Sequence, residues 1–240
     1  GGENMIDLPE KAIKAITENL VLQDTDGQKL VLQAIRNEER KGTFNSKAWV
    51  DLDNRYNGLL PIAADYNLIP ILIKRGCQII ILYNPSSNQI YLFLKRKTLR
   101  AQLKKGKATY YVKLLNLFNE EFDSLMPLEE QLNLFSEDAS FENYEDLREL
   151  GRKVLRNLQK DPSSVFVFTY DNQRLLPQVE AIAFNTKQEV VRHTDYSYLL
   201  DSNYEVDVQS DGIDSGTKES VILPMKKPQE KKQIVRLKSI

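Results

Sequence analysis

The residues best suited to chemistry in this sequence are cations, and they gather in one stretch of the chain. Between Asp65 and Glu120 lie 54 residues without a single Asp or Glu, yet with ten Lys or Arg. A surface of this density attracts phosphate groups, because each neutralised phosphate releases condensed counterions. The stretch is therefore a candidate surface for DNA or RNA, and its basic residues are Lys74, Arg75, Lys95, Arg96, Lys97, Arg100, Lys104, Lys105, Lys107 and Lys113.

Aromatic side chains near the cations strengthen the nucleic-acid hypothesis. Tyr91, Tyr110 and Tyr111 lie in or beside the basic stretch. Tyrosine rings can stack on bases, whatever the base sequence. We therefore predict that all of these cations except Lys113, together with Tyr110 and Tyr111, form a nucleic-acid-binding surface.

The same charge pattern has a second interpretation. Residues 120–149 hold eleven acidic residues and one Arg, directly after the basic stretch. Two successive helices of opposite charge can simply face one another, through exposed ion pairs worth roughly 0–1 kcal/mol each. The acidic 120–149 face, or the C-terminal tail, could instead bind a protein partner. The net charge of −1 hides this segregation.

Signatures of the common enzyme classes are missing from the sequence. No GxxxxGK[ST] or GxGxxG loop is present to bind a nucleotide phosphate, and there is no GxSxG nucleophile motif. One Cys and one His exclude a disulfide framework and a Cys/His zinc site. We interpret His193, in a polar turn context, as a surface residue and Cys77 as a buried small hydrophobe. The prediction is no catalytic residue, no metal and no cofactor.

Apolar periodicity predicts two groups of strands among several helices. The expected helices span residues 7–20, 26–42, 46–63, 98–105, 108–122 and 145–160, with a last helical turn at 196–200. The expected strands span residues 68–74, 77–83, 89–95, 165–170 and 179–185, with a further one near Val190. Short loops join the first three strands into an antiparallel meander, because a parallel crossover needs a dozen or more residues. The predicted fold class is α+β, a mainly antiparallel sheet flanked by helices on each side.

Composition predicts one domain and a tail. From Asp201 the chain is rich in Ser, Asp and Gly, and it ends in a cluster of Lys and Arg. We predict a single α+β domain at residues 5–200 and a charged C-terminal tail at 201–240, in which 221–223 or 234–237 docks as an edge strand or in a groove. No apolar run approaches 18 residues, so we expect a soluble, cytoplasmic protein without a membrane partner. No signal specifies an oligomeric state.

The order of helix, three antiparallel strands, helix and strand resembles the αβββαβ core of the restriction-endonuclease-like superfamily. That family holds Mg²⁺ with an Asp at the end of the second strand and a Glu-x-Lys in the third. Here residues 77–83 and 89–95 contain no acid at all. The resemblance therefore implies the topology without its catalytic acids, and the later Asp171 and Glu180 lack the clustered spacing of another site.

Four short motifs resemble a second family. They are Lys47-Ala48-Trp49, Leu72-Ile73-Lys74-Arg75-Gly76, Tyr91-Leu92-Phe93-Leu94-Lys95-Arg96 and Tyr110-Tyr111-Val112-Lys113-Leu114-Leu115-Asn116. Over roughly residues 45–195 the chain is similar to a bacterial domain-of-unknown-function family, common in Gram-positive genomes and their mobile elements. Tyr110 stands where that family often has His, which weakens a catalytic reading.

These observations lead to two expected functions. The first is a non-catalytic, nucleic-acid-binding accessory protein of a mobile element or phage-conflict system, with DNA or RNA as its partner. The alternative is a protein-interaction module, such as an inhibitor or an antitoxin-like subunit, that uses the acidic 120–149 face or the tail.

Overall fold

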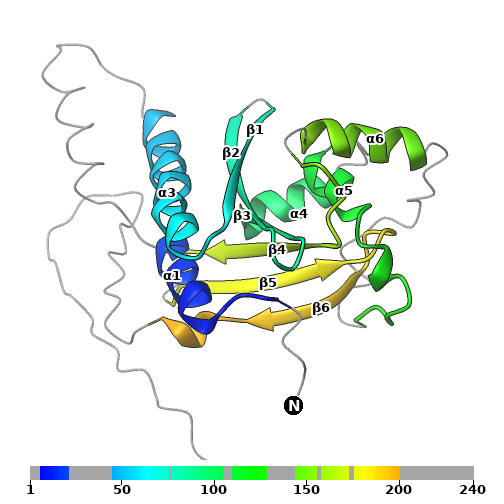
Figure 1. Ribbon diagram of the computed structural model, residues 1–240. Helices are drawn as coiled ribbons and strands as arrows, with labels where there is room; N and C mark the ends of the chain where they lie inside the picture. Colours follow the sequence, from blue (N-terminus) through cyan, green and yellow to red (C-terminus); the bar gives the residue numbers. More distant parts are fainter. Residues whose placement is uncertain are drawn as a thin grey trace, which may run out of the picture. The chain divides into compact units, whose positions relative to one another are not determined.

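The fold is described from a computed structural model of the chain (Figure 1). The structure describes residues 6–21, 45–75, 77–104, 110–128, 144–155, 158–172 and 176–200. The predicted helix at 26–42, the cations Lys105 and Lys107, and the tail at 201–240 lie outside these residues. Among the described residues, no helix is both long and apolar enough to cross a membrane.

A six-stranded sheet forms the centre of the fold, and its strands follow one another in chain order. Neighbouring strands are antiparallel except for β3 and β4, which are parallel. The predicted antiparallel meander of the first three strands and the three later strands are confirmed. The strands are β1 Ile69–Arg75, β2 Cys77–Asn84, β3 Gln89–Lys95, β4 Ser164–Asp171, β5 Gln178–Phe184 and β6 Val190–Asp195.

Helices precede the sheet, connect its two halves and cover it (Figure 1). The α-helices are α1 Glu10–Val21, α3 Asn45–Asp65, α4 Arg96–Lys104, α5 Tyr111–Asn116 and α6 Tyr144–Val154. Single 3₁₀ turns are η1 Glu120–Phe122 and η3 Ser197–Leu199, the latter at the predicted last turn. The α+β class, with a mostly antiparallel sheet and flanking helices, is confirmed.

Both faces of the central strands are covered, as their continuous apolar sequences predict. All interior residues of β3 and β4 are buried, although successive side chains point to opposite faces. Tyr170 and Glu180 mark the two faces, because Tyr170 pairs with Val179 in the register and Glu180 is the next residue of β5. Arg55 of α3 lies over the Tyr170 ring, whereas Arg96 of α4 pairs with Glu180. The two helices therefore meet opposite faces of the sheet.

The long helix predicted at residues 108–122 is wrong. The chain forms the short α5, leaves helical geometry and resumes as η1. Asn119, which is fully buried in the gap, explains the break. Its Nδ2 donates to the carbonyls of Val165 (3.0 Å) and Phe184 (2.7 Å), and its Oδ1 accepts from the Val165 amide (2.6 Å). These bonds to two strands hold Asn119 outside a continuous helix.

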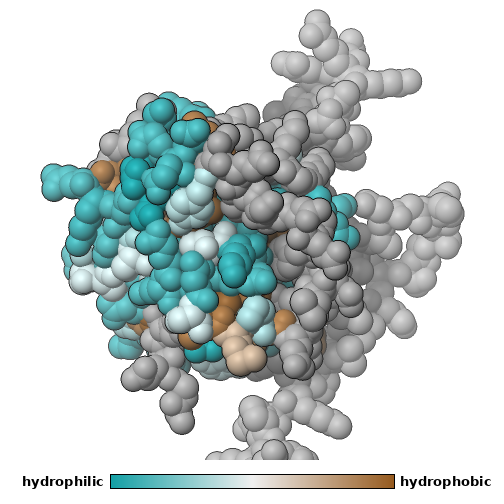
Figure 2. All heavy atoms as spheres, turned by 90° about the vertical axis from the view of Figure 1, so that its right-hand side faces the viewer, coloured by the Kyte–Doolittle hydropathy of each residue, from teal (hydrophilic) through white to brown (hydrophobic). Residues whose placement is uncertain are grey.

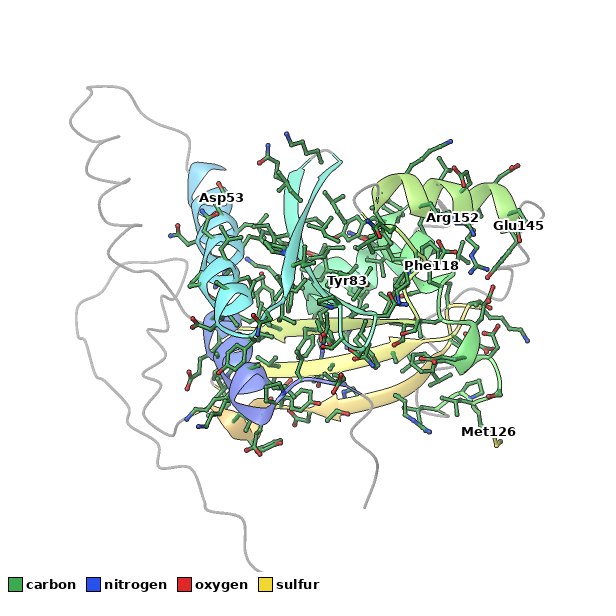
Figure 3. All side chains as sticks on the ribbon, viewed as in Figure 1. Asp53, Tyr83, Phe118, Met126, Glu145 and Arg152 are labelled. Carbon is green, nitrogen blue, oxygen red and sulfur yellow. The ribbon has the colours of Figure 1, made fainter. Side chains whose placement is uncertain are left out.

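The helix predicted at residues 145–160 also ends early, because α6 stops at Val154. Beyond it, the Asp161 carboxylate accepts hydrogen bonds from Arg148 (3.2 Å) and Arg152 (2.9 Å) of α6. This contact draws the chain back along the side of the helix, which a straight helix to residue 160 would not allow. Figure 3 shows Glu145 and Arg152 along α6, above Phe118.

Candidate nucleic-acid interface

The basic stretch meets the sheet where β3 ends and α4 begins, and its first two cations point to opposite faces. Lys95 is in register with Tyr170 and therefore points to the Tyr170 face. There its Nζ lies 3.3 Å from Oδ2 of Asp51 in α3. Arg55 forms a second ion pair with Asp51, and its Nε donates to the Leu20 carbonyl at 2.7 Å. Lys95 thus joins a structural charge cluster.

Arg96 is bound on the other face of the sheet. Its guanidinium forms an ion pair with the Glu180 carboxylate, and its Nη1 donates to Gln178 Oε1 at 3.1 Å. The opposite oxygen of Glu180 lies 3.3 Å from Nε2 of His193 in β6. Because Arg96 opens α4, this cluster fixes the start of the helix against β5 and β6.

The Glu180 carboxylate is charged in this cluster. Burial alone would raise its pKa, but the hydrogen bonds from His193 and Arg96 outweigh burial and lower the pKa to about 2. Conversely, the hydrogen bond to Glu180 raises the pKa of His193 above its ordinary value, against the opposing effect of burial. The Glu180 carboxylate is therefore ionised at neutral pH and pairs there with Arg96.

The rest of α4 presents cations to solvent. Lys97, Arg100 and Lys104 are exposed, whereas Leu99 and Leu103 are buried against the protein. The three cations are three and four residues apart, so they line one face of the helix. Within the part of the chain that the structure describes, none of the three has an ion pair or a hydrogen bond with another side chain. We call these three residues the α4 stripe.

The structure separates the predicted binding residues into engaged, buried and exposed ones. Lys95 and Arg96 are engaged in the two clusters above, and Lys74 is exposed on a different element, the β1–β2 hairpin. The side chain of Arg75 lies outside the described residues. Tyr111 is only 8% exposed and Tyr91 is fully buried, so neither ring has a free face for base stacking, while Tyr110 is partly exposed.

Lys113, which we did not assign to the interface, is also buried. Only 8% of its surface is exposed, and burial lowers its pKa. Its side chain therefore adds little to an external cationic surface. The exposed cations on described elements near the start of α4 are those of the α4 stripe.

Sequence reasoning missed the roles of Glu180 and His193. His193 is a surface residue, as predicted, but it lies within β6 and not in a turn, and it contacts Glu180. A weak signal was available, since Glu180 is the only charged residue in the apolar strand β5. Pairing between β5 and β6, which brings the two together, could not be read from either segment alone.

The acidic segment does not supply the partners of Lys95 and Arg96. Those partners, Asp51 and Glu180, come from α3 and β5. Of the described acids in 120–149, Glu120 pairs with Arg148 and Glu149 with Arg152. Figure 2 shows the side of the molecule on which α6 lies, where described residues are mostly hydrophilic. A protein-binding role for this face stays a prediction.

Metal-ligating residues are dispersed in the described ranges. No group of three or more His, Cys, Asp or Glu side chains there could hold a metal ion. The resemblance to the restriction-endonuclease-like family would place metal ligands on β2 and β3, and these two strands contain no Asp or Glu.

Comparison with known proteins gives one match. A family model described as "Family of unknown function (DUF5986)" matches residues 16–237. No curated protein and no solved structure matches the chain. The resemblance to an uncharacterised family is therefore confirmed, whereas the restriction-endonuclease-like topology and the bacterial, mobile-element context stay predictions.

Proposed function

Because the chain belongs to this family of unknown function, we propose its activity from the interface itself: the protein binds nucleic acid without cleaving it, through the α4 stripe. One observation carries the proposal. Lys97, Arg100 and Lys104 lie along one face of a helix, exposed and without acidic partners among the described residues. Unpaired cations held on a fixed helix are suited to successive phosphates of a polynucleotide backbone.

The anchoring of α4 supports this proposal. Lys95 and Arg96 are bound to acids on opposite faces of the sheet, so the helix that follows them starts from a fixed point. Cations on a fixed helix lose less conformational entropy on binding than the same cations on a mobile segment would. The two engaged cations therefore position the α4 stripe, and the stripe contacts the ligand.

The proposed biological role follows the resemblance and the charge pattern. The protein would act in the bacterial cytoplasm as an accessory protein of a mobile element or phage-conflict system. Phosphate contacts of this kind carry no base specificity, so both DNA and RNA are suitable ligands.

The binding test measures the affinity for a fluorescent 20-nucleotide single strand and for its duplex, by anisotropy, over a series of NaCl concentrations. Three phosphate contacts predict a log–log salt slope of roughly −2 to −3. The triple variant K97E/R100E/K104E should weaken binding by roughly 100-fold or more and flatten the slope. The matched control K153E/K160E/K187E makes the same charge change at exposed lysines on other elements and should keep most of the affinity.

Two results would overturn the proposal: no binding at low salt, or equal affinity of the α4 variant and the wild type. The non-catalytic part has its own test, in which the oligonucleotide is incubated with the protein and Mg²⁺ or Mn²⁺. We expect it to remain intact, because β2 and β3 lack the carboxylates that hold such metals in the resembled nucleases. Cleavage that one Asp or Glu substitution abolishes would contradict this expectation.

A further inference from the structure

The imidazole of His193 lies next to the start of the proposed interface. The Glu180 carboxylate connects the two, because one of its oxygens contacts Arg96 and the other contacts His193. Register supports the same placement, because His193 pairs with Ile182 and thus points to the face of Glu180, two residues earlier in β5. Arg96 is the first residue of α4, and Lys97 of the α4 stripe follows it directly.

One nitrogen of this imidazole is held and the side chain remains accessible. Nε2 lies 3.3 Å from Glu180, while 37% of the His193 side chain is exposed. A protonated imidazole carries an N–H on each nitrogen, so the Nδ1 side can still donate to an anion. The contact with Glu180 orients the ring through Nε2 and leaves the Nδ1 N–H of the imidazolium available to a phosphate.

We propose that His193 extends the nucleic-acid interface beyond α4, that its imidazolium contacts a phosphate of the bound strand, and that binding therefore takes up a proton. This inference rests on the proposed function. It identifies the ligand group as a phosphodiester and makes the affinity dependent on pH.

The surrounding charges explain why the proton matters. Among the described residues, the charged groups that face His193 are Glu180 of β5, Arg96 of α4 and Asp195, which shares its face of β6. With a neutral imidazole these groups sum to −1, which repels a phosphate next to the α4 stripe. Protonation brings the sum to zero and adds an N–H donor. A bound phosphate must in turn stabilise the imidazolium, because linkage between two binding events is reciprocal.

The direction of the pH effect follows from these charges. His193 is charged below its pKa, which the bond to Glu180 raises above the ordinary 6.5. Nucleic-acid affinity should be high below this pKa and fall as the pH rises through it. Glu180, with a pKa of about 2, stays ionised throughout that range.

His193 is the only histidine in the chain, so its NMR signal is unambiguous in protein made without a histidine tag. The experiment records the imidazole ¹H–¹³C signal from pH 5.5 to 9, with and without a saturating 20-nucleotide single strand. At 0.15 M salt, screening over about 8 Å limits the response to nearby phosphates. We expect the His193 pKa to rise on binding by roughly half to one pH unit, and the affinity to be correspondingly roughly threefold to tenfold higher at pH 6 than at pH 9.

Two variants complete the test. H193Q should bind at all pH values with the weaker affinity that the wild type has at pH 9. E180Q removes the carboxylate that raises the His193 pKa, so its affinity transition should move to lower pH. Strong binding with an unchanged His193 pKa would overturn this inference and leave the proposed function intact. Absence of binding at every pH would overturn both.

Discussion

Different kinds of side chain connect the sheet to the helices at its two ends. At one end, which we call the charged end, β3 and β4 finish and β5 begins, and ion pairs connect the strands to the helices through Asp51, Lys95, Arg96 and Glu180. At the other end, which we call the amide end, buried neutral amides make hydrogen bonds that connect the strands to the α5 region. There Asn119 binds β4 and β5, and Asn116 donates to Gln188 at 2.9 Å in the β5–β6 turn.

Under the proposed function, this difference predicts which end of the sheet lies near the ligand. Buried amides satisfy neighbouring backbone groups and carry no charge, so the contacts of Asn119 and Asn116 depend little on pH or salt. The charged end holds ionised groups beside exposed cations, and its properties change with both. A ligand of high negative charge should therefore bind near the charged end, and its affinity should depend on pH and salt. The following substitutions test that division.

The largest expected effect on stability is at the amide end. Asn119→Ala removes two hydrogen bonds that Asn119 donates to buried carbonyls and one that it accepts from a buried amide. The backbone groups left without a partner should lower the free energy of unfolding by about 3 kcal/mol. Urea unfolding at pH 7 and pH 5 should give the same loss, because no ionisable group is involved. The control Asn57→Ala, at an exposed position of α3, should change stability by less than about 0.5 kcal/mol. A pH-dependent loss in Asn119→Ala would break the comparison.

A smaller and pH-dependent effect is expected at the charged end. Since the pKa of Glu180 falls from 4.5 to about 2 on folding, its charge stabilises the fold above the unfolded pKa, and this contribution is lost as the pH falls from about 4.5 towards 2. Glu180→Gln should cost about 2 kcal/mol at pH 7 and much less at pH 2. Urea unfolding across this range measures the difference. The exposed Glu121→Gln serves as the control and should follow the wild-type pH curve.

The smallest effect is expected from Lys95. Its side chain is 38% exposed, and its partner Asp51 keeps an ion pair with the buried Arg55 when Lys95 is lost. Lys95→Gln should therefore cost less than about 1 kcal/mol, and the cost should shrink in 1 M NaCl. Thermal unfolding at low and high salt provides the measurement. A large, salt-independent loss would show that Lys95 is as structural as the amide end.

The sheet was the most predictable part of this protein. Apolar runs identified the first five strands, and short loops identified the first meander, because these features depend on neighbours in the chain. The sixth strand was placed only near Val190, since most of β6 is polar and exposed. Helix ends were less predictable. The break at Asn119 comes from hydrogen bonds to Val165 and Phe184, which are 46 and 65 residues away, and apolar periodicity carries no trace of them.

The candidate site was predictable only in part. The charge gap located α4 and its cations, since composition along the chain is a local property. Which cations are engaged depends on Asp51 and Glu180, which reach Lys95 and Arg96 only in the folded sheet. Burial of Tyr111 was hidden for a similar reason, because a tyrosine beside lysines in sequence can still face the core.

The single parallel pair in the sheet also bears on how the protein folds. Strands β1 to β3 and β4 to β6 are two local meanders, each of which forms its pairings across short connections. The β3–β4 seam joins residues that are about 75 positions apart, as in the pair Gln89 and Ser164. Closing so long a loop costs chain entropy before any contact repays it, so the seam should form late and limit the folding rate. Until it does, β3 and β4 each expose an unpaired edge, and the nascent chain is then most open to association with other chains.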